Sequence, residues 1–309
     1  MTLAIVCTHK DPSPWCEALQ QLAPELDIQV WPDVSDPAAV SMVLCWKHPP
    51  GVLLNFPNLQ CICSMGAGVD HMLGDPALPA DVPVVRLVDP MLAQSMFEYV
   101  CATVMYYYRD LDLYQGQQQR ALWLQQLPRS MGSTTIGVMG LGELGGFVAQ
   151  RFAAMGFKTI GWSRSSKAMT DVSCYVGQEG LAAFLAQTQI LVCLLPLTDE
   201  TRGILNADVF NALPRGACII NVARGEHLVE QDLLEALASE QVRGACLDVF
   251  QHEPLASTHP FWGHQNILLT PHCSSITNPS SVAPQVMENY RRLQHGETLL
   301  NRVDLQRGY

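Results

Sequence analysis

Three polar residues in the second half of the chain have the side chains that proton transfer to an anionic substrate requires. Arg224, Glu253 and His272 each follow an apolar run, and the spacings between them are 29 and 19 residues. In open α/β sheets, ligands bind at the edge where the strands end. Arginine binds a carboxylate through two hydrogen bonds, and histidine donates a proton near neutral pH. A glutamate beside the imidazole would orient the ring and favour its protonated form. The set suits reduction of a 2-oxo acid, in which negative charge builds on the carbonyl oxygen as hydride arrives.

Each of these residues also has a purely structural interpretation when it is taken alone. His272 follows a buried strand and could be a core histidine with satisfied hydrogen bonds, and Glu253 lies in a loop that contains proline. Any of the nine histidines could be a surface residue. The interpretation as a site therefore depends on the three residues occurring together.

A glycine-rich loop predicts where a phosphate group binds. Gly140, Gly142 and Gly145 follow one apolar run and open an amphipathic segment, VMGLGELGGFVAQRF. In a dinucleotide-binding loop, the first glycine permits a tight turn, the second lets the backbone approach a pyrophosphate, and the third lets helix and strand pack closely. An ordinary glycine-rich turn, or the related loop of a methyltransferase, is the alternative.

The end of the next strand predicts which dinucleotide is preferred. NAD-binding loops of this kind have an acidic residue about 20 positions on, which binds the ribose hydroxyl. Ser163, Arg164 and Ser165 stand there instead. Arginine forms charge-assisted hydrogen bonds with phosphate, and serine adds neutral donors. We therefore predict NADPH rather than NADH; the alternative is that Arg164 is an ordinary surface charge.

Two series of strands and helices must position these residues. Residues 1 to about 90 alternate apolar runs with helical segments, and a second series of this kind begins at residue 134. A long helical pattern over residues 90 to 127 lies between them. We interpret its glutamine-rich part as a helix face exposed to solvent. Another helix is predicted over about 279 to 295. Apolar strands alternating with helices predict an α/β fold with doubly wound parallel sheets.

Length and charge restrict the class of protein. A chain of 309 residues with 48% hydrophobic and 15% charged residues predicts two domains, each with a full core. The net charge of −11 argues against binding to nucleic acid or to an anionic membrane. No run approaches the roughly 20 apolar residues of a membrane span. Lys10 and Asp11 come too early for a secretory signal, so we predict a cytoplasmic protein.

The eleven cysteines predict reduced thiols rather than disulfides or a metal site. Cys193, Cys218 and Cys246 lie inside apolar runs, and no C-x-x-C pair occurs. Cys61 and Cys63 would lie on the same face of one strand and pack in the core. We expect no bound metal.

The sequence resembles the D-isomer-specific 2-hydroxyacid dehydrogenase family, and within it the glyoxylate/hydroxypyruvate reductase A branch, over nearly its whole length. Together the motifs that carry the resemblance are highly specific. They are Trp46-Lys47-His48-Pro49-Pro50, SMGAGVDHML (64–73), MFEYV (96–100), GLGELG (140–145), LPLTDETRGIL (195–205), NVARGEHLVEQDLLEAL (221–237), LDVFQHEPL (247–255) and TPH (270–272).

The resemblance implies a role for each of the three polar residues. His272 would be the general acid, Glu253 its partner and Arg224 the residue that holds the substrate. The implied substrate contacts also include the backbone of a glycine turn and two side chains of the N-terminal region: Gly66, Ala67, Gly68, Trp46 and Lys47. A plain tight turn, a core tryptophan and a surface lysine are the alternatives for these five.

The resemblance also implies which residues bind the cofactor. They belong to the glycine loop, the end of the next strand and three later strand ends. The set is Gly140, Gly142, Glu143, Leu144, Gly145, Ser163, Arg164, Ser165, Leu195, Pro196, Leu197, Val222, Ala223 and Asp248.

The family fold implies two domains, one of them discontinuous. Residues 1–98 and 281–309 would form a flavodoxin-like substrate-binding domain, and residues 99–280 an NADP-binding Rossmann domain. The site would lie in a cleft between the domains, which would close by a hinge motion and exclude water. Family members are usually homodimers through the segment near residues 90 to 127, so we expect a homodimer.

We therefore predict an NADPH-dependent reductase of small 2-oxo acids, converting glyoxylate to glycolate and hydroxypyruvate to D-glycerate. One alternative is a non-catalytic NADPH-binding sensor, like the corepressors of this family. Another is a methyltransferase, which would not explain the three polar residues after the later strands. The sequence does not rank glyoxylate and hydroxypyruvate against larger 2-oxo acids.

Overall fold

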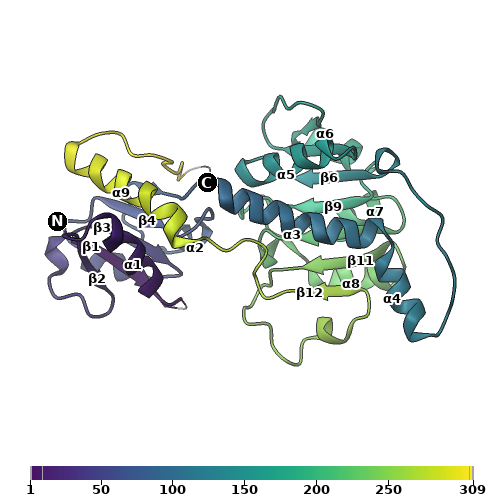
Figure 1. The fold of residues 1–309 in the computed structure, drawn as a ribbon, viewed down its shortest axis with the longest axis horizontal. Helices are drawn as coiled ribbons and strands as arrows, with labels where there is room; N and C mark the ends of the chain where they lie inside the picture. Colours follow the sequence, from purple (N-terminus) through teal and green to yellow (C-terminus); the bar gives the residue numbers. More distant parts are fainter. Residues whose placement is uncertain (1, 9, 306, 308–309) are drawn as a thin grey trace. The chain divides into compact units, whose positions relative to one another are not determined.

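The computed structural model describes residues 2–8, 10–305 and 307. The chain forms two compact units, each built on a parallel sheet (Figure 1). The first unit comprises Met1–Leu92 and Thr277–Tyr309, and the second comprises Ala93–Ile276. The boundaries fall at residues 92 and 276, whereas the sequence prediction has 98 and 280. The first boundary comes earlier because Met96 packs in the core of the second unit.

The first unit contains a five-stranded parallel sheet in the order β2-β1-β3-β4-β5. This is the flavodoxin-like doubly wound order that the sequence analysis predicts. Its strands are β1 (Thr2–Cys7), β2 (Asp27–Val30), β3 (Val40–Trp46), β4 (Cys61–Ser64) and β5 (Val84–Val85). Its helices are α1 (Ser13–Leu22), α2 (Asp70–Leu73) and α9 (Pro279–His295).

Alternating side chains of this sheet form two hydrophobic layers. Leu3 and Ile5 of β1 belong to one cluster, and Ala4 and Val6 belong to the other. Helices α1 and α9 lie side by side against the first cluster, although more than 250 residues separate them in sequence (Figure 1). The C-terminal helix therefore completes the core of the N-terminal sheet.

The second unit contains a seven-stranded parallel sheet in the order β12-β11-β10-β9-β6-β7-β8. Counted along this unit, that order is the Rossmann arrangement with one further strand, so the predicted fold class is confirmed. The strands are β6 (Thr135–Met139), β7 (Lys158–Ser163), β8 (Ser173–Val176), β9 (Ile190–Cys193), β10 (Ala217–Asn221), β11 (Val242–Leu247) and β12 (Ile267–Leu269).

Helices cover both faces of this sheet. Those packed against one face are α3 (Pro90–Tyr108) and α5 (Glu143–Ala154); those packed against the other are α6 (Gly177–Leu185), α7 (Ala207–Ala212) and α8 (Glu230–Ala238). In Figure 1, α3 crosses the sheet and α4 (Leu111–Gln119) continues from its end. Burial on both faces explains why the central strands are almost wholly apolar.

The prediction of a long helix over residues 90 to 127 is wrong in its second half. Helix α3 ends at Tyr108, and Asp110 takes a left-handed conformation with φ 56° before α4 begins. The Asp110 carboxylate accepts hydrogen bonds from Arg129 at 2.6 Å and from Arg243 at 2.8 Å. These distant arginines stabilise the break. After α4, no helix forms over residues 120–130.

Strand β8 has no counterpart in the sequence prediction. Its residues, SCYV, are half-buried or exposed because the strand lies at the edge of the sheet. An edge strand needs no continuous apolar run, so the local pattern that reveals the central strands is missing here.

The parallel register aligns the last residues of β6, β9, β10, β11 and β12, and the last but one of β7, in one row. The row pairs Met139 with Trp162 and with Cys193, Cys193 with Asn221, Asn221 with Leu247, and Leu247 with Leu269. The segments that follow these residues therefore emerge along one edge of the sheet.

All eleven cysteines are free, as predicted, and six of them are buried. Cys61 and Cys63 pack in the same cluster, which confirms their shared face. Burial raises the pKa of Cys193 and of Cys218 to about 12. None of the described helices is both long and apolar enough to cross a membrane.

Candidate active site

The glycine loop connects β6 to α5, and two of its glycines are required by close packing. Gly140 has φ +98°, and a Cβ there would lie 2.6 Å from the carbonyl oxygen of Leu194. A Cβ on Gly145 would overlap the carbonyl oxygen of Gly140. Gly140 also donates its N–H to the Trp162 carbonyl at 2.8 Å. The loop is therefore held tightly against the ends of β7 and β9.

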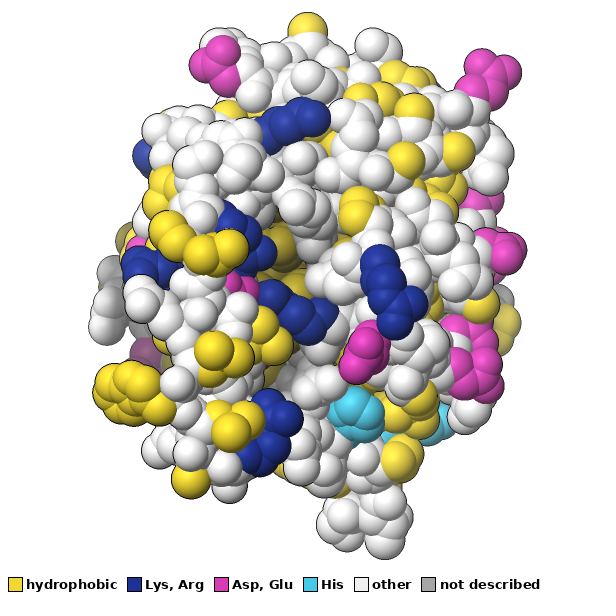
Figure 2. All heavy atoms as spheres, turned by 90° about the vertical axis from the view of Figure 1, so that its right-hand side faces the viewer, with side chains coloured by type: hydrophobic (Ala, Val, Ile, Leu, Met, Phe, Trp, Pro, Cys, Tyr) yellow, Lys and Arg dark blue, Asp and Glu magenta, His cyan; other side chains and the backbone are white. Residues whose placement is uncertain are grey.

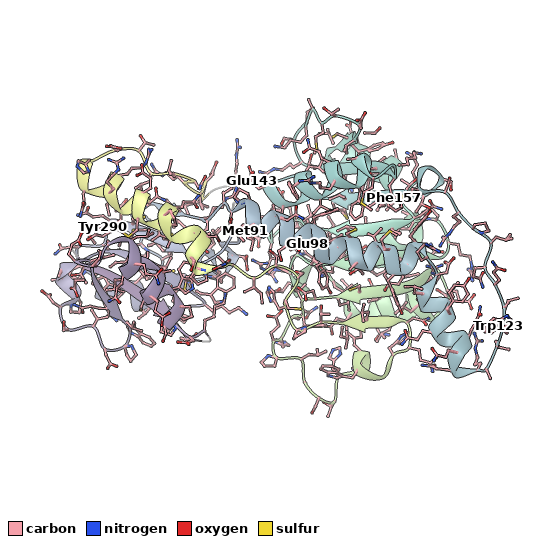
Figure 3. All side chains as sticks on the ribbon, viewed as in Figure 1. Met91, Glu98, Trp123, Glu143, Phe157 and Tyr290 are labelled. Atoms are coloured by element: carbon pink, nitrogen blue, oxygen red, sulfur yellow. The ribbon has the colours of Figure 1, made fainter. Side chains whose placement is uncertain are left out.

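Gly142 lies in a different environment from the other two glycines. It precedes the first turn of α5, and a Cβ there would have no heavy atom within 4 Å. Packing within the protein therefore does not explain the glycine. The open space lies where helix amides point toward an anion, which fits the predicted approach of a pyrophosphate. Glu143 is exposed at the start of the same helix (Figure 3), and Leu144 follows it.

Two of the three residues expected at a 2′-phosphate, Arg164 and Ser165, are exposed after β7. Ser163 is buried, and its hydroxyl donates to the carbonyl of Ser165 at 2.8 Å. Ser163 thus shapes the turn. The side chain of Arg164 is 48% exposed and lies 3.7 Å from the carboxylate of Glu200, which is 75% exposed. An ion pair this exposed is weak, so a phosphate could replace the Glu200 carboxylate as its partner.

The residues after β9 and β10 that the sequence predicts at the cofactor also lie directly beyond the row of aligned strand ends. Leu195, Pro196 and Leu197 come after β9, and Thr201 holds that loop by donating to the Pro196 carbonyl at 2.7 Å. Val222 and Ala223 directly follow β10 and are buried. The structure therefore brings these residues to the sheet edge that carries the glycine loop.

His272 and Glu253 form a direct side-chain pair. Nδ1 of His272 lies 2.9 Å from Oε2 and 3.0 Å from Oε1 of Glu253. Their side chains keep 33% and 21% of their exposure. The backbone N–H of Phe250 also donates to the Glu253 carboxylate, at 3.2 Å. Because a carboxylate accepts, Nδ1 carries the hydrogen, and Nε2 is the ring nitrogen that can serve a substrate.

The backbone at His272 has a strained conformation. Its φ is +52°, in the left-handed region that residues with a Cβ rarely adopt. The His272 N–H donates to the carbonyl of Asp248 at 2.8 Å. Asp248, expected at the cofactor, is fully buried, and its carboxylate accepts the N–H groups of Cys273 and Ser274 at 2.9 Å.

Arg224 lies two residues beyond Val222, in a turn tied to neighbouring segments. Its guanidinium donates to the Ala223 carbonyl at 2.7 Å, and its own carbonyl accepts from the Asn221 side chain at 2.9 Å. Gly225 packs against the backbone of Phe250, so closely that a Cβ would overlap it. The turn that carries Arg224 therefore contacts the loop that carries Glu253.

His227 is a residue of this region that sequence reasoning missed. It is fully buried. Its Nδ1 accepts the N–H of Arg224 at 3.2 Å, which leaves Nε2–H to donate to the Pro196 carbonyl at 3.3 Å. His227 thus joins the Arg224 turn to the loop after β9. It falls inside the quoted NVARGEHLVE motif, but only the fold shows its partners.

The substrate residues expected near the N-terminus cluster within the first unit. Trp46 ends β3, and a Cβ on Gly66 would lie 2.9 Å from its indole ring. Lys47, with φ 46°, donates its N–H to Nδ1 of His71 at 3.4 Å, and the rings of Trp46 and His71 lie 4.4 Å apart. The Ser64 hydroxyl donates to the Gly68 carbonyl at 2.8 Å, with Ala67 between the two glycines. The sequence analysis did not identify His71, which contacts Trp46 and Lys47 on one side and the Ser64 hydroxyl, next to the glycine turn, on the other.

Comparisons with known proteins agree with this geometry. A family model described as "D-isomer specific 2-hydroxyacid dehydrogenase, NAD binding domain" matches residues 101–274. The glyoxylate/hydroxypyruvate reductases A of Yersinia enterocolitica and Serratia proteamaculans are each 42% identical over 300 residues, covering 96% of this chain and 96% of each relative.

Solved structures give the same result. A D-isomer-specific 2-hydroxyacid dehydrogenase from Xanthobacter autotrophicus, in complex with NADPH and MES, superposes with a TM-score of 0.95 at 43% identity, covering 100% of this chain and 99% of that chain. An NADPH-dependent glyoxylate/hydroxypyruvate reductase from Sinorhizobium meliloti, in complex with NADP and sulfate, gives 0.93 at 36% identity and covers 100% of both chains.

These similarities extend over nearly the full length of the chain, and the strand order and glycine loop agree with them. The chain therefore belongs to the D-isomer-specific 2-hydroxyacid dehydrogenase family. Within it, the curated relatives lie in the glyoxylate/hydroxypyruvate reductase A branch, as the sequence motifs predict.

Replacing Gly225 tests the contact between the Arg224 turn and the Glu253 loop. We expect Gly225→Ala to lower the free energy of unfolding by about 1–3 kcal/mol or more, because the new methyl group overlaps the Phe250 backbone. Urea denaturation measures this change. Gly263→Ala is the matched control, since a Cβ there has no neighbour within 4 Å. Equal stability of the two variants would contradict the packing argument.

Proposed function

We propose that the protein is an NADPH-dependent reductase of small 2-oxo acids. The observation that carries this proposal is the His272–Glu253 pair, with Nδ1 2.9 Å from the carboxylate, on the sheet edge that also carries the glycine loop. Both a proton donor and a dinucleotide loop are needed to reduce a carbonyl, and one row of strand ends supports both.

The residues present fit a phosphorylated dinucleotide. Gly140 and Gly145 shape the loop, Gly142 leaves its backbone open, and Arg164 is a cation at the end of β7 where NAD-specific loops have an acid. Leu195–Leu197 and Val222–Ala223 would line the rest of the site, and Glu143, Leu144 and Asp248 are carried over from the family. When bound, NADPH supplies a hydride.

The side chains of the second unit divide the remaining chemistry between them. His272 gives the proton on Nε2 to the carbonyl oxygen, so that the C=O group becomes CH–OH as the hydride reaches carbon. Glu253 accepts the Nδ1–H, orients the ring and stabilises its positive charge. Arg224 holds the substrate carboxylate with its guanidinium. In the first unit, the backbone of Gly66–Gly68 with Trp46 and Lys47 is carried over from the family as a set of substrate contacts.

The names of the relatives support the choice of substrates. Glyoxylate and hydroxypyruvate appear in the names of curated relatives that are 42% identical to this chain. Reduction would convert them to glycolate and D-glycerate. The first unit would be the substrate-binding domain and the second the NADP-binding domain, while the cytoplasmic location stays a prediction.

We further propose that the chain forms a homodimer through the segment after α4. Four large apolar side chains are exposed there: Leu122 at 50%, Trp123 at 103%, Leu124 at 63% and Leu127 at 87%. Figure 3 shows Trp123 on the extended segment that follows α4, and Figure 2 shows hydrophobic side chains exposed among arginines and lysines on this side of the unit. Arg129 anchors the far end of the segment by its hydrogen bond to Asp110. A fixed apolar patch of this kind is typical of an interface, and a second copy of the chain is the partner we propose.

Removing two of these side chains tests the dimer. We expect Trp123→Ser with Leu127→Ser to weaken self-association by about two to four orders of magnitude, because each apolar side chain buried at an interface contributes roughly 1.5–3 kcal/mol. Light scattering after gel filtration measures the mass. Leu54→Ser, at a 62% exposed leucine of the first unit, is the control. A monomeric wild-type protein would refute the proposal.

The proton-transfer role of His272 predicts a large kinetic defect. His272→Gln should lower kcat by about two to four orders of magnitude, the usual contribution of general acid catalysis, with unchanged NADPH binding. The assay follows NADPH absorbance with glyoxylate and with hydroxypyruvate. His295→Gln, at an exposed histidine of α9, is the control. Near-wild-type turnover of His272→Gln would exclude the role, and inactive wild-type protein that still binds NADPH would favour the non-catalytic sensor.

The cation after β7 predicts the cofactor preference. Arg164→Ala should raise the KM for NADPH by about 10- to 100-fold and leave that for NADH nearly unchanged, because only NADPH carries the 2′-phosphate. Arg215→Ala removes another exposed arginine with an acidic neighbour and should change neither value. Equal effects of Arg164→Ala on both cofactors would show that Arg164 does not read the phosphate.

A further inference from the structure

A chain of hydrogen bonds links helix α3 to the turn that carries His272. The hydroxyl of Tyr99 lies 2.5 Å from Oγ1 of Thr270, and Oγ1 of Thr270 lies 2.6 Å from Oδ1 of Asp248. Tyr99 is 171 residues from Thr270 in sequence. Neither Tyr99 nor Thr270 has a place in the chemistry described above, and Asp248 is fully buried.

The hydrogen atoms available on these three side chains fix which group donates in each hydrogen bond. An ionised Asp248 only accepts, so the single hydroxyl hydrogen of Thr270 is directed to it. Thr270 must then accept from Tyr99, whose hydroxyl is the donor. Burial raises the pKa of Tyr99 well above its usual value, so Tyr99 keeps its hydrogen at neutral pH. The Sγ atom of Cys246 lies 3.3 Å from the Tyr99 hydroxyl and completes its surroundings.

Asp248, the acceptor at the end of this series of hydrogen bonds, also holds the backbone around His272. Oδ1 of Asp248 accepts the N–H of Cys273 as well as the Thr270 hydroxyl, and Oδ2 accepts the N–H of Ser274. The carbonyl of Asp248 accepts the N–H of His272. Asp248 therefore binds the turn on both sides of a residue whose φ of +52° is unfavourable by itself. Rotation of this carboxylate would free two amides at once.

We propose that Tyr99 and Thr270 are positioning residues for proton transfer: their hydroxyls fix the rotation of the Asp248 carboxylate, which holds the His272 turn. The inference rests on the proposed function for its kinetic effect, but the anchoring of the turn is a property of the fold alone. This series of hydrogen bonds also makes the position of His272 depend on helix α3. Neither the glycine loop nor the His272–Glu253 pair by itself needs that helix.

Substitutions that remove one hydroxyl each test the proposal. Tyr99→Phe and Thr270→Val should each lower the single-turnover rate of hydride transfer by about tenfold, since small displacements of a catalytic group slow the reaction strongly. The dissociation constant for NADPH should change much less than the rate does, because the glycine loop and Arg164 are untouched and Asp248 is only one of the residues proposed to contact the cofactor. Thr270→Ser keeps the hydroxyl and should retain the wild-type rate. The double variant should be no slower than Thr270→Val alone, because both changes break one chain.

Tyr106→Phe is the matched control for Tyr99→Phe. Tyr106 lies on the same helix and donates its hydroxyl to Gln115 at 2.7 Å, away from the His272 turn. This variant loses a comparable hydrogen bond and should keep the wild-type rate. Equal rates for Tyr99→Phe and Tyr106→Phe would overturn the proposal, as would a loss of rate in Thr270→Ser as large as in Thr270→Val.

Hydrogen exchange gives a readout that does not depend on activity. The peptide covering residues 270–276 should exchange faster in Tyr99→Phe and Thr270→Val, because the amides of Cys273 and Ser274 lose a fixed acceptor. A peptide from α5 should be unchanged, and so should both peptides in Tyr106→Phe. Unaltered exchange of residues 270–276 would refute the anchoring. If the wild type reduced no 2-oxo acid while exchange changed as expected, the proposed function would fail and the anchoring would stand.

Discussion

Parallel pairing of six strands of the second unit fixes one row of residues, from Trp162 through Met139 to Leu269. Hydrogen bonding continues one residue beyond the row: Gly140 donates to Trp162, Leu194 to Met139, and Thr270 to Leu247. Because the register is shared, the segment after each strand begins at the same level. The glycine loop, the Arg224 turn, Asp248 and the His272 turn all begin within three residues of the row. If one strand slipped by a residue, its loop would move by about 3.3 Å and its side chains would change faces.

Close approach of backbone to backbone then brings these segments together. Gly145 packs on Gly140, Gly140 on Leu194, and Gly225 on Phe250, each where a Cβ would meet another main chain. These glycines serve packing, whereas Gly142 faces open space. The distinction matters for mechanism, since a glycine that packing explains says nothing about a ligand, while a glycine with free space beside it leaves the backbone accessible.

Charge acts locally in this protein. The chain carries a net charge of −11, yet the ligands proposed for it are anions. Arg164 and Arg224 lie after strands of one sheet, and the N-terminus of α5 adds the positive end of a helix dipole. At physiological salt, charges more than about 8 Å apart in solvent are largely screened, so these nearby groups rather than the total charge decide which ligand binds.

The sequence by itself determined the fold class, the glycine loop and the central strands. It also singled out Arg224, Glu253 and His272 as candidate catalytic residues, a role that stays a prediction. Apolar periodicity and glycine spacing are local patterns, so they can be recognised in the sequence without knowledge of the fold. Edge strand β8 was missed because partial exposure removes its apolar run, and the end of α3 was missed because Arg129 and Arg243 stabilise Asp110 from far along the chain. Only the tertiary structure decided that His272 meets Glu253, that His227 joins two loops, and that Tyr99 reaches Thr270 across 171 residues. Such contacts arise from the register of strands and the packing of helices, which no local pattern specifies.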